Sequence, residues 1–299
     1  MDDVDQLAEW FQSHRLRLRG LAYRMLGSLS EADDAVQEAW LRVSRAGTEG
    51  VDNLDGWLTT VIARVCLNML RTRTTRREQP LGVHMPDPVV SRMGQFDPEQ
   101  EALLSESVGL ALLVVLDSLN PAERVAFVLH DIFGLPFDEV AAVVATTPAA
   151  ARQLASRARR RVRQAAPPPD VDLARQRDVV DAFFAASRNG DLAALVDILH
   201  PDVVLRADGG LARPSASLVI RGGINLAGQA VIFAEGAPLA HPAVVNGAAG
   251  VVVTRHGRPL SVMGFIVTNG RIASIDVLAD PERLARLGLA DWPTDALPA

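Results

Sequence analysis

Apolar residues recur every three or four positions through most of the first 165 residues, and this period predicts amphipathic helices. We expect helices over residues 4–27, 30–46, 53–75, 99–118 and 121–133. Prolines interrupt the pattern over residues 79–98, where we expect an extended linker. The first part of the chain is therefore predicted to be all-α.

Two further apolar stripes lie close together after residue 136. The members of these stripes, three or four residues apart, are Phe137, Val140, Ala141 and Val144, then Ala151, Leu154, Ala158 and Val162. Thr147 is a candidate N-cap, and Pro148 suits the first position of the second helix. Two helices with so short a link predict a helix-turn-helix.

The second of these helices carries mainly polar side chains on the side away from its apolar stripe. The outward residues are Ala149, Arg152, Gln153, Ser156, Arg157 and Arg160. Residues 140–169 include six arginines and no Asp or Glu, so this segment is basic although the whole chain has a net charge of -6. Because arginine pairs with guanine and glutamine with adenine in the major groove, the pattern favours DNA binding. The alternative is a solvated, charged helix end.

Three consecutive prolines at residues 167–169 end the helical part, because proline cannot continue a helix. Helices are then expected over residues 175–188 and 191–199, and strands over 203–206, 217–221, 251–255, 262–268 and 272–278. Asn269-Gly270, between the last two strands, is a strong hairpin signal. This block is predicted to be α+β, with two helices followed by a curved antiparallel sheet.

Length and composition add limits. A chain of 299 residues suggests about two domains. The single Cys66 excludes an internal disulfide and a cysteine-based zinc site, and we expect neither a metal nor a cofactor. The first residues are acidic, and no apolar run reaches the roughly 18 residues of a membrane span. We therefore expect a cytoplasmic protein without a membrane partner.

Residues 21–28, 32–42 and 57–71 resemble region 2 of the bacterial extracytoplasmic function (ECF) sigma factors, and the helix-turn-helix resembles their region 4. The last block resembles the SnoaL-like, NTF2-like cone of the SigJ-like subgroup. The resemblance implies a multidomain chain with region 2 over residues 1–77, a linker over 78–100, region 4 over 101–165, a proline-rich linker over 166–172 and a SnoaL-like regulatory domain over 173–299.

The resemblance also implies two partners, core RNA polymerase (its β′ clamp helices and β flap) and promoter DNA. The polymerase contact is expected at Asp33, Asp34, Gln37, Glu38 and Leu41. The −10 element is expected to be read by Arg64, Asn68, Arg71 and Arg73, and the −35 element by Arg152, Gln153, Ser156, Arg157 and Arg160. Without the resemblance, the acids of the first set fit a solvated helix face better.

Three motifs of the SigJ-like subgroup have counterparts in this chain. Pro86, Asp87 and Pro88 correspond to WLPEP; Asp208, Gly209 and Gly210 to DGGGK; and Asp280, Pro281 and Arg283 to NPDKL. The tryptophan, the third glycine and the lysine of these motifs are replaced. The resemblance implies that these residues form an interdomain contact that regulates the sigma regions in cis, with either sign.

Two other functions stay open on sequence alone: a stand-alone DNA-binding regulator, and a cone enzyme with a DNA-binding arm. The titratable residues of the cone are Asp208, His200, His241 and His256, and no pair has a spacing that suggests shared acid/base work. We therefore expect no catalysis. A small-molecule ligand in the cone stays open. The free chain is expected to be monomeric, because it has one helix-turn-helix and no evident dimer helix.

Overall fold

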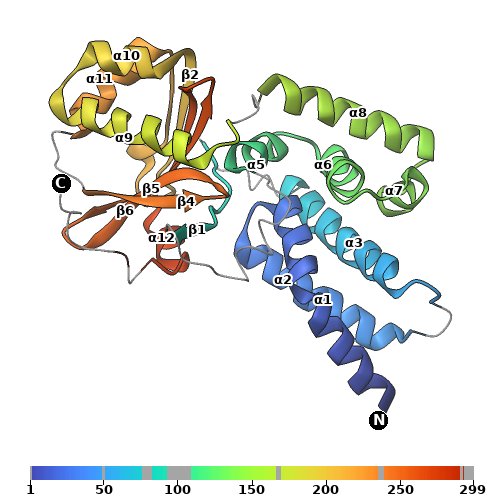
Figure 1. Ribbon diagram of the computed structural model, residues 1–299. Coiled ribbons are helices and arrows are strands. Elements are labelled where there is room, and N and C mark those ends of the chain that lie inside the picture. The colour runs from blue at the N-terminus through green and yellow to red at the C-terminus, as the bar shows by residue number, and fades with distance from the viewer. Residues whose placement is uncertain are drawn as a thin grey trace. The chain divides into compact units, whose positions relative to one another are not determined.

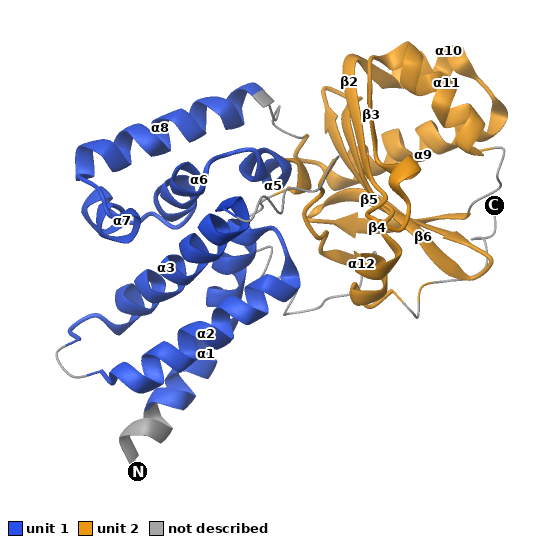
Figure 2. Ribbon diagram, turned by 180° about the vertical axis from the view of Figure 1, so that it is seen from behind, with its two compact units in different colours: residues 1–79, 97–108, 112–165 blue, residues 80–96, 109–111, 166–299 orange. Residues whose placement is uncertain are grey.

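The computed structural model describes residues 2–48, 51–75, 83–92, 109–165, 170–234, 239–289 and 292. The chain divides into two compact units (Figure 2). The helical unit comprises residues 1–79, 97–108 and 112–165, and the sheet unit comprises residues 80–96, 109–111 and 166–299. The expected combination of all-α regions and an α+β domain is confirmed.

Three long helices open the helical unit (Figure 1): α1 (Asp2–Leu26), α2 (Leu29–Ala46) and α3 (Leu54–Thr75). Ser28 caps α2, because its hydroxyl accepts a hydrogen bond from the amide of Glu31. Cys66 of α3 is fully buried, and burial raises the pKa of its thiol. The expected ends of these helices are confirmed to within two residues.

Shorter helices follow: α5 (Leu110–Asp117), α6 (Pro121–Phe127), the π-helical turn η1 (Val128–Ile132), α7 (Phe137–Val144) and α8 (Pro148–Ala165). The helix predicted over residues 121–133 thus widens into a π turn. Ala145, with φ 60°, makes the left-handed turn between α7 and α8, and the helix-turn-helix is confirmed. Of the helix predicted over residues 99–118, positions 99–108 lie outside the described residues.

A seven-stranded sheet forms the centre of the sheet unit, in the order β1-β4-β5-β6-β7-β2-β3. The strands are β1 (Val90–Arg92), β2 (Leu199–Asp208), β3 (Leu218–Arg221), β4 (Leu239–Val245), β5 (Ala248–Arg255), β6 (Arg258–Thr268) and β7 (Arg271–Leu278). The remaining elements are α9 (Leu173–Asn189), α10 (Leu192–Ile198), the 3-10 turn η2 (Pro214–Ala216), α11 (Gly223–Ala234) and α12 (Pro281–Arg286). Helices α9, α10 and α11 lie together on one side of the sheet (Figure 1).

The sheet differs from its prediction in three ways. It is mixed, because β2 pairs in parallel with β7 while the other pairs are antiparallel. Helix α11 and strand β4 have no counterpart in the prediction, since α11 lacks a charged face and Pro242 interrupts the strand pattern of β4. Strand β1 lies within the expected linker and pairs with β4. The hairpin at Asn269-Gly270 is confirmed, with φ of 53° and 70°.

A large core cluster of the sheet unit lies on one face of the sheet. Its buried members alternate along the strands, as Val251 and Val253 do on β5 and Phe265 and Val267 do on β6. Residues at the intervening positions, such as Val252, point to the opposite face. Because successive side chains point to opposite faces, the position of a residue along its strand determines whether it faces this core cluster.

Candidate functional site

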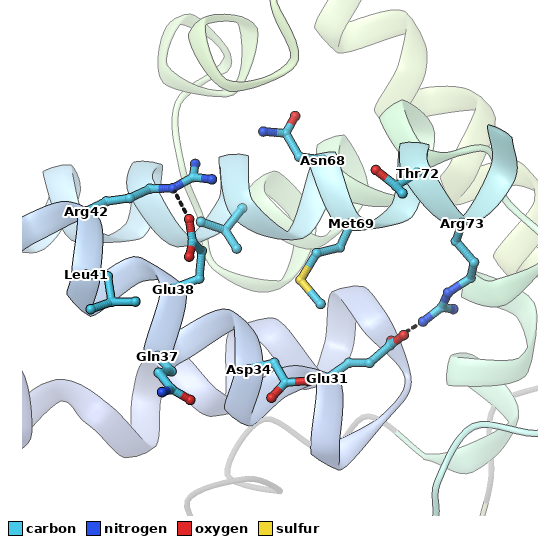
Figure 3. Close-up of a pocket in the computed structure, with 11 residues that line it drawn as sticks. Glu31, Asp34, Gln37, Glu38, Leu41, Arg42, Asn68, Met69, Thr72 and Arg73 are labelled. Carbon is cyan, nitrogen blue, oxygen red and sulfur yellow. Dashed lines mark hydrogen bonds and ion pairs between the residues drawn. The ribbon is translucent and has the colours of Figure 1, made fainter. Parts of the chain in front are cut away.

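A groove of about 560 Å³ runs between α2 and α3 in the helical unit (Figure 3). Its lining residues are Glu31, Asp34, Gln37, Glu38, Leu41 and Arg42 from α2 and Val65, Asn68, Met69, Thr72 and Arg73 from α3. The groove therefore joins four of the five residues expected to contact polymerase with two of the four expected to read the −10 element.

Two ion pairs organise the charges of the groove (Figure 3). Glu31 and Arg73 pair across it, and Arg42 Nε donates to Glu38 Oε1 at 2.8 Å along α2. The fifth expected polymerase residue, Asp33, does not line the groove; its carboxylate accepts from Arg19 Nε at 2.7 Å. The groove thus combines exposed acidic groups with an exposed apolar side chain, since Leu41 is 39% exposed.

The residues of α3 expected to read the −10 element have different surroundings. Asn68 and Arg71 are exposed, and Asn68 is one of the residues that line the groove. Arg64 donates from Nη2 to the carbonyl oxygen of Ala142 in α7, at 3.1 Å. Arg73 is partly buried and held by Glu31. Two of these four residues are therefore engaged within the helical unit.

Helix α8 buries Ala151, Ala155 and Ala158. The residues predicted to face outward are exposed, namely Ala149, Arg152, Gln153, Ser156, Arg157 and Arg160. Leu154 and Val162 lie at the edge of the buried stripe, while Ala155 belongs to it and was missed by the sequence pattern. The outward face of the second helix is thus arranged as the pattern predicts.

Several arginines of α8 have partners on the preceding elements. The guanidinium of Arg152 lies over the ring of Phe137, 5.0 Å from its centroid. Arg159 pairs with Asp131 at 2.6 Å. Arg161 Nη1 donates to Glu123 Oε2 at 3.1 Å, and Arg157 Nε lies 3.8 Å from Glu123 Oε1. Acids outside the basic segment thus neutralise part of its charge.

Adjacent residues on α6, Glu123 and Arg124, were missed by the sequence analysis. Both are buried, with 2% of each residue exposed. Arg124 donates to the carbonyl oxygens of Leu116 at 2.6 Å and Met25 at 2.8 Å, and to the carboxylate of Asp117 at 2.6 Å. Burial lowers the pKa of Arg124, and Asp117 opposes that shift. A charged pair in a first helical turn ordinarily indicates exposure, so the sequence carried no signal for this role.

A second polar cluster, the linker clamp, lies within the sheet unit and consists of Met85, Asp87, Asp208 and Arg283. Arg283 donates to Asp87 Oδ1 and to Asp208 Oδ2, each at 2.8 Å, and also to the carbonyl oxygen of Met85. The amide of Met85 donates to Asp208 Oδ2 at 2.9 Å. The side chains of Asp87, Asp208 and Arg283 are 13%, 6% and 16% exposed, so the cluster is largely removed from water.

The remaining motif residues shape the backbone around the linker clamp. Gly210, at φ 64°, donates its amide to Asp208 Oδ1 at 2.9 Å, and an added Cβ would meet Asp280. An added Cβ at Gly209 would collide with backbone. Asp280 caps α12 by accepting from the amides of Glu282 and Arg283, with Pro281 as the first helical residue.

The two prolines that flank Asp87 are buried, and the chain then enters β1. Pro86 and Pro88 lack amide protons, so they suit an extended segment that is fixed by its neighbours. Just before β1, the amide of Val89 donates to Asn246 Oδ1 at 3.1 Å, and the amide of Asn246 donates back to the carbonyl oxygen of Val89 at 2.9 Å. Of the motif residues, Pro86, Asp87 and Pro88 therefore lie on one docked segment, Asp208 and Arg283 contact it directly, and Asp280 caps the helix that carries Arg283.

The titratable residues considered for catalysis do not meet in the core of the sheet unit. Asp208 belongs to the linker clamp, and His241 is buried against Thr254 at 2.8 Å, where burial lowers the pKa of the imidazole. His200 is exposed, and His256 lies in the turn between β5 and β6.

Comparisons with known proteins assign the family. Residues 10–76 match "Sigma-70 region 2" and residues 109–162 match "Sigma-70, region 4". Over 293 residues, the chain is 36% identical to "Probable ECF RNA polymerase sigma factor SigI" of Mycobacterium tuberculosis (strain ATCC 25618 / H37Rv), covering 95% of this chain and 97% of SigI. It is 44% identical over 214 residues to "ECF RNA polymerase sigma factor SigJ" of the same strain, covering 71% of this chain and 68% of SigJ.

The structural comparison extends this likeness to the sheet unit. The crystal structure of Mycobacterium tuberculosis SigJ matches with a TM-score of 0.75 and 34% identity, covering 95% of this chain and 99% of that chain. The chain belongs to the ECF RNA polymerase sigma factors. Its function is that of a sigma factor, which directs RNA polymerase to promoters. Among the described residues, no helix combines the length and the apolar character needed to cross a bilayer.

Proposed function

We propose that this sigma factor binds the β′ clamp helices of core polymerase through the α2–α3 groove. The exposed Asp34 and the half-exposed Glu38, which pairs with Arg42, lie beside the apolar Leu41 and support this, because such a surface suits a basic partner with an apolar anchor. Asp33 is paired with Arg19, so it can bind polymerase as expected only if this ion pair opens.

Promoter reading is proposed for α3 and α8. The exposed Asn68 and Arg71 support a contact of α3 with the −10 element, whereas Arg64 and Arg73 must first leave Ala142 and Glu31. The outward residues of α8 support a contact with the −35 element in the major groove. The residues proposed to make this contact are Arg152, Gln153, Ser156, Arg157 and Arg160, and contacts of this kind are shared between bases and phosphates.

The sheet unit is proposed to regulate the sigma regions in cis by holding the linker between them. The observation that carries this is the double contact of Arg283, which pairs with Asp87, 196 positions away in sequence, and with Asp208, 75 positions away. While the linker is bound to the sheet, it is not available to bind polymerase, so the two contacts compete. Because Asp208 is engaged by the amide of Met85 in the linker and by Arg283, the unit is proposed to be regulatory and not enzymatic.

Run-off transcription with bacterial core polymerase on genomic promoter fragments tests the proposal. The compared proteins are the full chain, Arg283→Met, which breaks the linker clamp, and Arg286→Met, a control on the exposed side of α12. We expect specific transcripts from the full chain, an altered yield with Arg283→Met and an unaltered yield with Arg286→Met. Equal yields from all three contradict regulation by the clamp.

The same experiment separates the sigma factor from a stand-alone regulator. A folded chain that yields no transcript and does not bind core polymerase, but binds duplex DNA alone, is the result expected of the regulator. Removal of residues 170–299 gives the sign of regulation, since a restraining unit raises transcription when it is removed and an assisting unit lowers it.

A further inference from the structure

Glu123 is a buried carboxylate that faces the second helix of the helix-turn-helix. Its side chain is 3% exposed, while the side chains of its two partners, Arg157 and Arg161, are each 53% exposed. The amide of Glu123 is held by the Asn120 cap at 2.8 Å, which fixes the start of α6. A carboxylate so far from water requires a cation beside it, because the protein interior replaces little of its lost hydration.

The two arginines lie four residues apart and so share one side of α8. That side borders the outward face, on which Gln153, Ser156 and Arg160 are exposed. Arg157 therefore stands where the packed side of the helix meets its outward face. From this position its guanidinium can contact Glu123 through one edge while the rest remains accessible to DNA.

Arg157 Nε also donates to the carbonyl oxygen of Gln153 at 3.5 Å, and the contact with Glu123 restricts this half-exposed side chain further. Arginine has many rotamers, and ordering one during binding lowers affinity by about two- to tenfold. A partner fixed in the fold removes much of this loss before DNA arrives. The carboxylate also places negative charge beside the basic face, and this charge weakens contacts with phosphates that ignore the base sequence.

We infer that Glu123 is a positioning residue for −35 recognition, which orders Arg157 for base contact and suppresses binding to non-specific DNA. The inference rests on the proposed reading of the −35 element by α8. Two effects of opposite sign follow from removing the charge at Glu123. Preference for the −35 sequence falls, while affinity for non-specific DNA rises. General loosening of the helical unit lowers both quantities.

The test measures DNA binding by holoenzyme reconstituted from the full chain and core polymerase. The probes are a promoter from which the wild-type protein initiates, the same promoter with a substituted −35 element, and a non-promoter duplex, each over a range of salt concentrations. The variants are Glu123→Gln, Arg157→Ala and the double variant. Asp131→Asn is the control, because it removes the partner of a different arginine of α8, Arg159.

With Glu123→Gln we expect the −35 preference to fall about two- to tenfold and non-specific affinity to rise. In the Arg157→Ala background, Glu123→Gln should change the −35 preference no further, because both act through one guanidinium. Asp131→Asn should leave the preference intact. If Glu123→Gln does not fold, Glu123→Asp serves, since it keeps the charge but withdraws the carboxylate from Arg157, and a smaller loss of preference is expected.

The inference is overturned if the variant at Glu123 leaves the −35 preference unchanged, if its effect multiplies with that of Arg157→Ala, or if Asp131→Asn has the same effect. These results leave the reading of the −35 element by α8 standing, provided that the wild-type protein prefers the intact promoter. A wild-type protein without such a preference overturns both the proposed reading and the inference.

Discussion

Replacing Arg283 by methionine tests how strongly the linker clamp holds the linker on the sheet unit. Methionine keeps most of the apolar length of the side chain but removes the guanidinium that donates to Asp87, Asp208 and Met85. Two carboxylates then remain in a site where the intact side chains are only 13% and 6% exposed. The linker can relieve this by leaving the sheet, so the clamp opens more often.

The magnitude follows from the number and burial of the lost contacts. A hydrogen bond to a charged group contributes about 1.5–3 kcal/mol, and Arg283 makes three with carboxylates, two to Asp87 Oδ1 and one to Asp208 Oδ2. Removing one partner of a buried ion pair costs about 3–5 kcal/mol. Taking about 3 kcal/mol as the change in the free energy of local opening gives an increase of about 100-fold in the opening equilibrium.

Amide hydrogen exchange of the full chain measures this opening directly. The amides of Met85 and Val89 are the reporters, because their acceptors are the side chains of Asp208 and Asn246. We expect both to exchange about 100-fold faster in Arg283→Met, while amides in the middle of β6 keep their protection. Unchanged exchange at both reporters, or an equal acceleration in Arg286→Met, refutes the assignment of the clamp to Arg283.

Three further predictions concern other parts of the chain. Burial raises the pKa of Asp276 to about 6 against the opposing effect of Arg206, so the folded protein binds the proton more tightly than the unfolded chain does. The free energy of unfolding should therefore fall as pH rises from about 4 to 6, and denaturation at several pH values should show this slope in the wild type and not in Asp276→Asn. Arg124→Met should lower the free energy of unfolding of the helical unit by about 3–5 kcal/mol, because the carboxylate of Asp117 and the carbonyl oxygens of Leu116 and Met25 lose their donor. Urea titration followed by circular dichroism measures this loss. Glu38→Arg should weaken binding to core polymerase about tenfold at low salt and less at high salt, whereas unchanged binding in a pull-down series argues against the groove as the contact.

The sequence predicted the elements whose residues interact with near neighbours. The three long helices and the two helices of the helix-turn-helix have apolar stripes of a single period, and capping side chains mark the start of α2, α3 and α8. The outward face of α8 followed from the same period. The hairpin at Asn269-Gly270 was predictable because the two residues supply the required positive φ on their own.

What the sequence could not predict depends on partners that are distant in the chain. Strand β1 has only three residues and exists because β4 pairs with it, so no local pattern marks it. Parallel pairing of β2 with β7 is likewise a property of the whole sheet. Glu123 was missed because its burial depends on arginines 34 and 38 positions later, and a charged residue in isolation indicates solvent.

The linker supplies the outermost strand of the sheet, next to β4. While β1 is in place, the backbone of β4 has a hydrogen-bonding neighbour on each side along that stretch. Departure of the linker uncovers the amides and carbonyls of β4, and an uncovered edge accepts any extended segment that reaches it. Release of the linker thus exposes an edge at which another extended segment can bind in competition with the linker.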